Sequence, residues 1–486
     1  MLGDFFRFWW ALFYWNARKT VFVLRGARGA APCQNPSDSG RAGETSCEAC
    51  LHWRCPGRFR AVCPALVASP QGWRCSLNAA GVRPYWRRAA VAWALAGTLL
   101  WIAGTLGGWG ACRAVGYREL RYADFWSVHF RARFRSAQAD YYQRQAAAAF
   151  ASGDFSRGLM ALFVAYDRNP QNLEAGLLLA QLLQRTRQAE RGDRLFQRLL
   201  HDFPARNEEI AAAWADALLA REDYASLARL AAQQAGASGR AAAVWARALV
   251  YSLRQLNGAA FAAAATAAEP VVPERWREVL SVERRLRAGD AAGAKALLAA
   301  PTLVADPFAI YYRVETLLQL GALDEAATIL RQGAGLLGQF HRHLLGYRIA
   351  VARGTGPAAD LLFESLLQPP LIPEKIELLS AELLRRPVAT RVAELFTAVE
   401  RNGGIPARND VQIALLIAAA ASDESTRVGQ VIARSREVSP GSEAGLKRLA
   451  VYLRGGAEAE PLHGLLDTLP VPRELVYALL EMRRAR

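Results

Sequence analysis

Hydrophobic and polar positions follow a helical period along most of the chain. From about residue 138, Ala and Leu recur every three or four positions, and short polar breaks separate the apolar stretches. No strand-like alternation of any length is visible in this part of the sequence. The pattern predicts a series of amphipathic helices over residues 138–455, followed by helices over residues 456–486 that cap its C-terminal end.

One stretch departs from this amphipathic pattern because it contains no charge. Residues 89–111 read AAVAWALAGTLLWIAGTLGGWGA, 23 residues that as a helix would be about 35 Å long. That length crosses a hydrocarbon core of ~30 Å, whereas a buried helix of a globular domain would usually carry a polar stripe. Arg87 and Arg88 flank one end and Arg113 the other. The sequence predicts a single transmembrane helix, with Trp93, Trp101 and Trp109 as its membrane contacts.

Two further expectations concern this helix. Gly104 and Gly108 have the GxxxG spacing that lets two membrane helices approach closely, so a homodimer through this face is possible. The positive charges near the helix do not indicate its orientation in the membrane, since four Arg lie within about 20 residues on each side. An 88-residue basic tail without a cleavable signal is awkward to export, so we expect a cytoplasmic N-terminus and a periplasmic repeat array.

The start of the chain is strongly aromatic. Residues 5–15 read FFRFWWALFYW, eight aromatic residues in eleven. The stretch lacks the leading positive charge of a signal peptide and is too short to span a bilayer. We therefore predict that residues 1–25 form a helix in the headgroup region, with Asp4, Arg7, Ala11, Tyr14 and Arg18 on one side. Its expected membrane contacts are Trp9, Trp10 and Trp15; the alternative is that the aromatic side chains pack on the segment that follows.

Charge supports contact with a membrane surface. The chain carries a net charge of +16, and residues 1–88 alone hold 13 Lys and Arg against 4 Asp and Glu. Residues 138–486 are nearly balanced, with 41 basic and 38 acidic residues. A nucleic-acid-binding domain would carry its basic surface on the folded body, so no nucleic-acid partner is expected. The lipid bilayer is the partner that this distribution favours.

Residues 26–88 form a basic module with six cysteines. Frequent Pro and Gly predict a loop-rich segment with little core of its own, which needs a covalent or metal staple. Cys47-x2-Cys50 places two sulfurs on one tight turn, as a tetrahedral zinc site requires. A structural zinc held by four of the candidate ligands is one prediction; three disulfides or free thiols remain the alternatives. The candidate ligands are Cys33, Cys47, Cys50, Cys55 and Cys63.

Residues 112–137, which follow the predicted transmembrane helix, are expected to form a juxtamembrane linker.

The helical region has a repeat period. Pro204 follows Pro170 by 34 residues, and Gly289 follows Gly153 by 136, four times that spacing. Small residues where two helices cross, apolar residues between them and Pro after the second helix repeat with this spacing. The positions expected to pack the repeats are Ala146, Gly153, Ala165, Pro170, Ala180, Gly192, Phe196 and Pro204. In these features residues 138–455 resemble the tetratricopeptide repeat (TPR) family. The resemblance implies an all-α solenoid that binds a protein or peptide on its concave face.

Motifs for catalysis are missing from the sequence. It contains no P-loop, no HExxH, no GxSxG and no EF-hand loop, and no cofactor other than the possible structural zinc is expected. We therefore expect a non-enzymatic, single-pass membrane scaffold that assembles partners of a bacterial envelope or secretion complex. The alternative is an accessory subunit of an envelope enzyme with a metal- or redox-responsive cysteine module.

Overall fold

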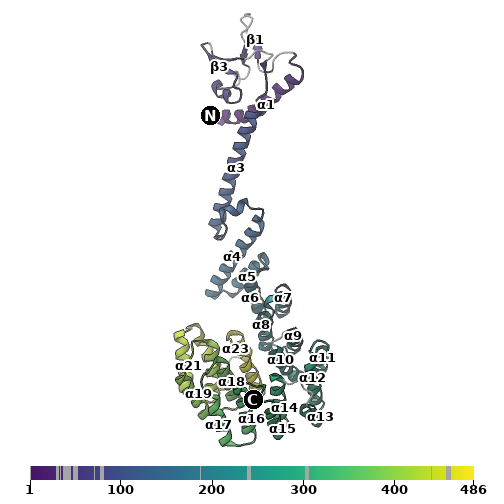
Figure 1. The fold of residues 1–486 in the computed structure, drawn as a ribbon. Coiled ribbons are helices and arrows are strands. Elements are labelled where there is room, and N and C mark those ends of the chain that lie inside the picture. The colour runs from purple at the N-terminus through teal and green to yellow at the C-terminus, as the bar shows by residue number, and fades with distance from the viewer. Residues whose placement is uncertain are drawn as a thin grey trace. The chain divides into compact units, whose positions relative to one another are not determined.

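The structure is a computed structural model of the 486-residue chain. It describes residues 2–28, 32, 34–36, 45–47, 53–70, 72–76, 81–186, 188–237, 242–300, 306–438, 440–455 and 461–485. The chain divides into two compact units, Met1–Gln145 and Ala146–Arg486, and each is described by itself. Figure 1 shows the elements of both units.

The first unit combines two long helices with a small sheet. Its elements are α1 (Leu2–Leu24), β1 (Gln34–Pro36), β2 (Thr45–Cys47), the 3-10 helix η1 (Pro56–Ala61), β3 (Leu66–Ser69), β4 (Gly72–Cys75), α3 (Trp86–Val115), the 3-10 helix η3 (Tyr122–Trp126) and α4 (Phe130–Ala151), whose end enters the second unit. The strands pair antiparallel in the order β1-β2-β4-β3. The sequence predicted a loop-rich segment here in a chain that is otherwise helical, and the four short strands add a small sheet to this segment.

One face of α1 completes the core of this small domain. Leu12, Trp15 and Phe22 are buried and pack with Phe59 and Leu66 of the cysteine-containing segment. Burying large side chains of this kind contributes roughly 1.5–3 kcal/mol each, which a domain of this size needs. The helix expected over residues 1–25 is therefore present, but part of it packs on protein.

Tandem helical hairpins make up the second unit. They are α5 (Phe155–Arg168), α6 (Leu173–Gln184), α7 (Ala189–Asp202), η4 (Pro204–Arg206), α8 (Asn207–Ala220), α9 (Tyr224–Ala237), α10 (Ala242–Gln255), α11 (Gly258–Ala268), α12 (Glu274–Arg287), α13 (Ala291–Ala299), α14 (Pro307–Gln319), α15 (Leu323–Gln332), α16 (Gln339–Ala352), α17 (Gly356–Leu366), α18 (Pro373–Arg385), α19 (Ala389–Arg401), α20 (Asn409–Ala421), α21 (Ser425–Val438), η5 (Pro440–Ser442), α22 (Glu443–Leu453), α23 (Leu462–Thr468) and α24 (Arg473–Ala485). Even-numbered helices from α6 to α16, and α20, contact the odd-numbered helices that follow them, whereas α18 packs mainly on α20 and α24. We call the even-numbered set the inner helices.

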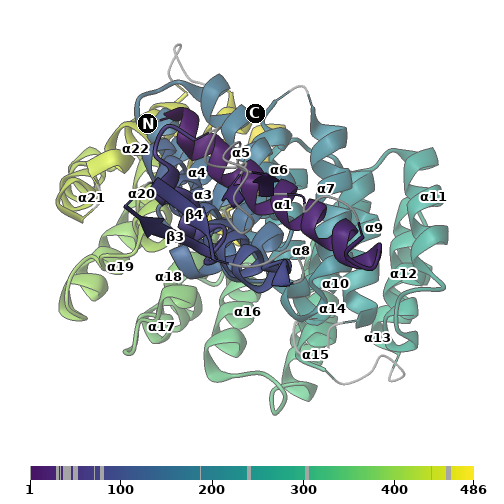
Figure 2. The same ribbon diagram turned by 90° about the horizontal axis from the view of Figure 1, so that it is seen from above.

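Stacking of neighbouring hairpins buries a continuous core. Inner helices contact one another as well as their hairpin partners, for example α6 with α8, α10 with α12, and α14 with α16. In α20 every side chain from Val411 to Ala420 is buried. A helix that is apolar nearly all round must be enclosed, and α20 lies between α18 and α22. Figure 2 shows α15, α17, α19 and α21 toward the rim of this array.

The last helix lies inside the curved array. α24 packs against α18, and α23 packs against α8, so the end of the chain contacts helices that are far apart in sequence. Six consecutive residues of α24, from Leu475 to Leu480, are buried. The sequence predicted a terminal cap with Arg and Glu on its outer side. The tail instead bridges the inner helices, because its apolar residues occur on all sides of the helix and cannot be left in water.

Candidate protein-binding chamber

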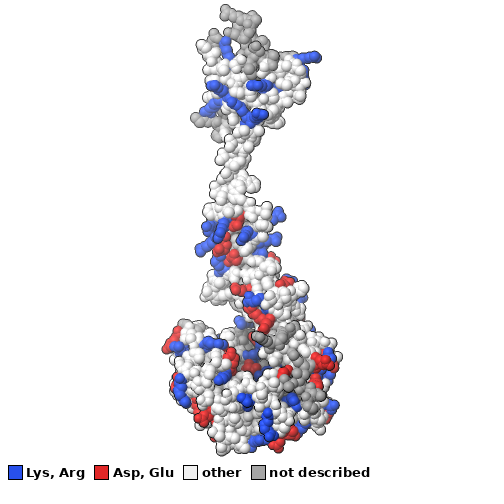
Figure 3. Space-filling view, viewed as in Figure 1, with Lys and Arg blue, Asp and Glu red and all other residues white. Residues whose placement is uncertain are grey.

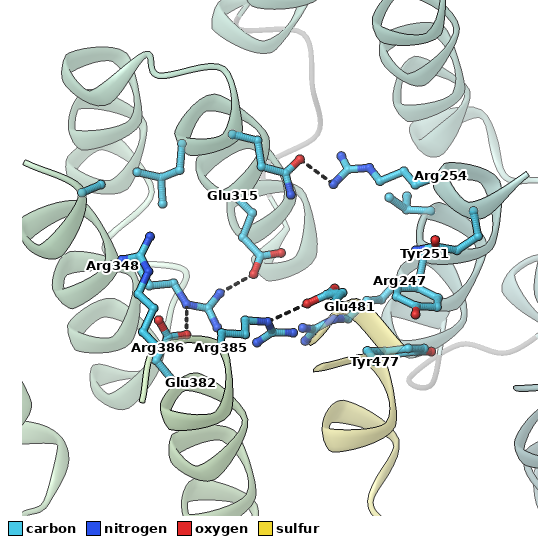
Figure 4. Close-up of a pocket in the computed structure, with 15 residues that line it drawn as sticks. Arg247, Tyr251, Arg254, Glu315, Arg348, Glu382, Arg385, Arg386, Tyr477 and Glu481 are labelled. Carbon is cyan, nitrogen blue, oxygen red and sulfur yellow. Dashed lines mark hydrogen bonds and ion pairs between the residues drawn. The ribbon is translucent and has the colours of Figure 1, made fainter. Parts of the chain in front are cut away.

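Inner helices and α24 line a cavity of about 480 Å³ that is open to solvent on one side, which we call the chamber (Figure 4). Its polar lining comes from α10, α14, α16, α18 and α24 and includes Arg247, Tyr251, Arg254, Glu315, Gln319, Arg348, Glu382, Arg385, Arg386, Tyr477 and Glu481. Pockets for small apolar molecules are lined mainly by hydrophobic side chains. Here eight of the fifteen lining residues are charged, five Arg and three Glu, which suits a ligand with charged groups.

Arg348 lies at the centre of the buried charges in the chamber. Its side chain is 9% exposed and reaches two carboxylates: Nε donates to Glu382 Oε2 at 2.8 Å, and Nη1 pairs with Glu315. Burial alone would lower the pKa of Arg348, but Glu382, Tyr311 and Glu315 together outweigh that effect and raise it. Burial would raise the pKa of Glu315, yet the neighbouring guanidinium groups, first Arg348 and then Arg247, hold it below its ordinary value. Arg348 and Glu315 therefore stay charged at neutral pH.

A second buried ion pair forms the opposite side of the chamber. Arg254 donates through Nε and Nη2 to Glu283 at 3.0 and 2.6 Å, and the carboxylate of Glu283 is 3% exposed. Tyr312 Oη also donates to Glu283 at 2.8 Å, and Thr316 Oγ1 accepts from Arg254 at 3.0 Å. Burial would lower the pKa of Arg254, but Glu283 raises it. Charge-assisted bonds to a planar guanidinium hold this side chain in one orientation.

Polar and aromatic contacts hold α24 against the inner helices. Its charged residues form ion pairs with three earlier helices and one turn: Arg473 with Asp216, Glu474 with Arg247, Glu481 with Arg385, and Arg483 with Glu222 of the α8–α9 turn. The ring centroids of Tyr477 and Tyr251 are 4.2 Å apart, and burial raises the pKa of both hydroxyls. Arg473 also lies over the ring of Trp245 at 5.5 Å. α24 therefore closes one side of the chamber and connects α8–α10 to α18.

Most of the charges in the chamber lining are arranged as ion pairs. Four of the five arginines in the lining are paired with a glutamate: Arg247 with Glu474, Arg254 with Glu283, Arg348 with Glu382, and Arg385 with Glu481. Among the residues that the structure describes, no group of three or more His, Cys, Asp or Glu side chains could hold a metal ion. A ligand in the chamber would meet guanidinium donors and carboxylate acceptors that ion pairs hold in fixed orientations.

The sequence-predicted packing residues lie where hairpins meet. Ala146, Ala165 and Ala180 are buried in α4, α5 and α6, and Phe196 of α7 is buried and stacked on Trp214 at 5.8 Å. A side chain on Gly192 would lie 3.1 Å from the Ala180 carbonyl oxygen, so α6 and α7 approach closely there. The turn positions are Gly153 between α4 and α5, Pro170 between α5 and α6, and Pro204 at the start of η4.

The predicted membrane tryptophans have different environments. Trp10, Trp93 and Trp101 are 64%, 51% and 57% exposed, and Trp9 lies against Trp93 with ring centroids 5.0 Å apart. Trp15 is 6% exposed and packs on Phe59. Trp15 is therefore a core residue, and its assignment as a membrane contact was wrong. The helical spacing left its side undecided until the position of the small domain was known.

The polar side predicted for α1 also differs from the structure. Ala11 was placed on that side, but it is buried with Leu12, while Phe5, Phe6 and Phe13 are more than half exposed. Lys19 is 3% exposed, and its Nζ lies 3.1 Å from Cys63 Sγ and 5.1 Å from the ring centroid of Tyr85. α1 thus has one face in the core and one exposed aromatic face, which combines both interpretations of the sequence.

Of the candidate zinc ligands, Cys55 and Cys63 are described fully. Both are free thiols; Cys55 is exposed, and Cys63 is buried beside Lys19. Cys33 and Cys50 lie outside the described residues, and Cys47 is described only as backbone in β2. Zinc binding therefore stays a prediction of the sequence.

The proposed dimer face of α3 is partly covered by the same chain. A side chain on Gly108 would lie 3.3 Å from the Phe125 ring, whereas nothing described lies within 4 Å of the same position on Gly104. Gly108 thus accommodates an intramolecular contact, which the GxxxG pattern alone did not indicate.

Sequence reasoning missed the charged residues of the chamber, although a signal was present. Arg348 precedes Glu382 by 34 residues and follows Glu315 by 33, and Glu283 precedes Glu315 by 32. These spacings follow the repeat period, so charges of both signs recur at matching positions of successive inner helices. Applying the period to charged residues as well as to Gly, Ala and Pro would have found them. Tyr477 and Glu481 had no such signal, because they come from outside the array.

Comparisons with known proteins add little to this geometry. No protein-family profile matches the sequence, and no curated protein matches it. Among solved structures the chain is similar to that of yeast Tom70, with 11% sequence identity over 72% of this chain and 88% of that chain and a TM-score of 0.31. A similarity of this size does not extend to ligands or partners, so function has to be argued from the chamber and the exposed surfaces.

Proposed function

We propose that the chain is a membrane-anchored helical-repeat scaffold, of the TPR type, that binds a protein or peptide in the chamber and catalyses no reaction. The observation that supports ligand binding is the chamber. Side chains from five helices converge on a cavity of about 480 Å³, with buried charges held by ion pairs. Stacked hairpins are a common way to build an extended concave binding surface, and oriented charges supply specificity on it.

The cost of the buried charges supports a role beyond stability. Desolvating an ion pair often costs as much as its attraction returns, so apolar residues at Arg348 and Glu382 would stabilise the array about as well. Arg386 lines the chamber and is exposed, so a ligand can reach a cation there. A peptide that carries both carboxylates and basic groups fits this lining best.

Membrane anchoring is supported by the surface of α3. It is 30 residues long, and among the described residues it is the one helix long and apolar enough to cross a membrane. Only 6% of its most apolar window is buried; Leu95, Leu99 and Leu100 are each more than 60% exposed. The visible face of its middle part carries no charged side chain (Figure 3). Leaving these side chains in water would cost roughly 1.5–3 kcal/mol each, which a bilayer removes.

Site-specific cross-linking in native membranes tests the proposal. The full chain would carry a photoreactive p-benzoylphenylalanine in place of Arg386 in the chamber, or in place of Leu361, an exposed residue of α17, as the matched control. We expect a discrete protein adduct at Arg386 and none at Leu361. In a second variant, Glu382→Gln should reduce the yield at Arg386 by disturbing the charges of the chamber. Equal adducts at both positions, or none at Arg386, would contradict the proposal.

A further inference from the structure

The segment after α3 folds back along the helix that it leaves. The chain turns at Gly116, and residues 117–130 return beside the C-terminal half of α3. Trp109 Nε1 donates to the Leu120 carbonyl oxygen at 3.1 Å, and Tyr122 Oη shares a hydrogen bond of 3.0 Å with Thr105 Oγ1. The Trp126 ring lies 5.9 Å from that of Trp101. The segment expected as a plain linker thus covers α3 from Trp109 back to Trp101.

The outer surface of this fold-back carries two large apolar side chains among charged and polar ones. Trp126 is 50% exposed and Val128 is 94% exposed, and Arg118, Glu119, Arg121 and His129 are exposed as well. Trp126 lies against Trp101 and so continues the exposed apolar surface of α3. Phe125 turns the other way and contacts Gly108 and Phe130. An apolar surface that continues from a membrane helix onto an adjacent segment favours lipid over water as its surroundings.

The backbone of the fold-back limits how deep it can lie. Apart from η3 and the start of α4, its backbone is not helical. Irregular backbone exposed to lipid does not occur in the hydrocarbon core, because its polar groups would have no partners. Arg121 and Asp124 join in a hydrogen-bonded turn at the start of η3, which also requires a polar setting. Apolar side chains combined with charged and irregular backbone groups fit the headgroup region, where aromatic rings are enriched.

We propose that residues 117–130 lie in the lipid headgroup region beside α3 and form an aromatic collar around its C-terminal half. This inference rests on the proposed membrane crossing. Because Trp126 reaches Trp101 and Tyr122 reaches Thr105, the hydrocarbon-crossing part of α3 then ends between Trp101 and Thr105 instead of at Ala111. From Ala89 to these positions the helix has 13 to 17 residues and is about 20–25 Å long. That is about 5–10 Å less than an average hydrocarbon core, a mismatch that local thinning of the bilayer accommodates at fractions of a kcal/mol per Å.

The collar has a counterpart at the other end of α3. The exposed aromatic residues of α1 lie beside the start of α3, where the Phe13 and Trp86 rings are 6.2 Å apart and Trp9 meets Trp93. Aromatic groups from two other segments therefore contact the uncharged part of α3, at Trp93 and at Trp101. A helix bordered in this way is held at a set depth in the bilayer, since moving it along the membrane normal would draw one collar into hydrocarbon or the other into water.

Photo-cross-linking to lipid tests the inference. The full chain would be reconstituted in nanodiscs of phosphatidylcholine and phosphatidylglycerol, with p-benzoylphenylalanine in place of Val128, Leu99 or Leu361. Leu99 lies in the middle of α3 and reports on the crossing itself; Leu361 lies in the repeat array and serves as the negative control. We expect lipid adducts at Leu99 and Val128 and none at Leu361. Fragment masses should place the Val128 adduct near the glycerol backbone and the Leu99 adduct along the acyl chain.

The possible outcomes separate the two proposals. An adduct at Leu99 without one at Val128 would overturn the collar and leave the membrane crossing intact. An adduct at Val128 near the acyl terminus would also overturn the collar, because the segment would then lie in hydrocarbon. No adduct at Leu99 would overturn the crossing, and the collar with it.

Discussion

Removing the charge of Arg348 should destabilise the repeat array strongly. The guanidinium is 9% exposed, and its partner Glu382 is 5% exposed, so Arg348→Met leaves a carboxylate without a counter-ion in a place that water hardly reaches. Breaking a buried pair by removing one member costs about 3–5 kcal/mol. Glu315, with 29% exposure, can be hydrated and should add about 1 kcal/mol or less.

Removing both charges should return most of this loss. Arg348→Met combined with Glu382→Leu leaves no unpaired charge at the buried position and keeps the volume similar, so we expect the double variant to lie within about 1–2 kcal/mol of the native chain. The matched control is Arg353→Met, also at the end of α16. Arg353 pairs with the almost fully exposed Asp324, so the control should cost less than about 1 kcal/mol.

Urea unfolding of the full chain in a mild detergent, followed by far-UV circular dichroism, measures these differences. The helical signal comes mainly from the repeat array, and the shift of the midpoint gives the change in the free energy of unfolding. The reasoning would be refuted if Arg348→Met cost no more than Arg353→Met. It would also be refuted if the double variant were less stable than Arg348→Met alone, because the loss would then not come from an unpaired charge.

Three further predictions follow from other contacts. Gly108→Val should displace Phe125 and expose residues 117–130 to limited proteolysis, whereas Gly104→Val has open space and should not; equal effects of the two variants on a dimer, without new cleavage, would favour helix pairing instead. Burial and the neighbouring Asp410 raise the pKa of Glu377 to about 7, so the folded chain binds this proton more tightly and loses stability as pH rises from about 4.5 to 7. Glu377→Gln should therefore stabilise the chain at pH 8 by about 1–2 kcal/mol after allowance for solvent screening, and not at pH 4; a gain that did not change with pH would contradict the assignment. Leu479→Ala, at a fully buried position of α24, should lower the free energy of unfolding by about 2–5 kcal/mol; a loss below 1 kcal/mol would mean that α24 is not packed between the inner helices.

Local patterns in the sequence were enough to locate the helices. The 34-residue spacing from Pro170 to Pro204 matches the hairpin boundaries of α5 to α8, and the uncharged run over residues 89–111 lies within α3. Both signals come from neighbours in the chain: helical periodicity repeats every 3.6 residues, and a membrane-length run needs no distant partner.

The sequence was a poorer guide to which face of a helix is buried and which residues cover it. Trp10 and Trp15 look alike in the sequence, yet one is exposed and the other lies in the core against Phe59. Which of the two is buried depends on where the small sheet domain lies against α1. That position is set by contacts between α1 and residues more than 40 positions away in the sequence. The same holds for Gly108, whose neighbour Phe125 reaches it only because the chain turns back at Gly116.

One apolar helix of membrane length, a basic aromatic N-terminal region and a long array of helical hairpins can all be read from the amino-acid sequence, because periodicity and composition within short windows encode each of them. Only the tertiary structure showed that α24 enters the curved array, that charges 32–34 residues apart meet around the chamber, and that residues 117–130 fold back on α3. Those features depend on the curvature of the whole array and on where turns direct the chain, and both follow from the packing of many side chains at once.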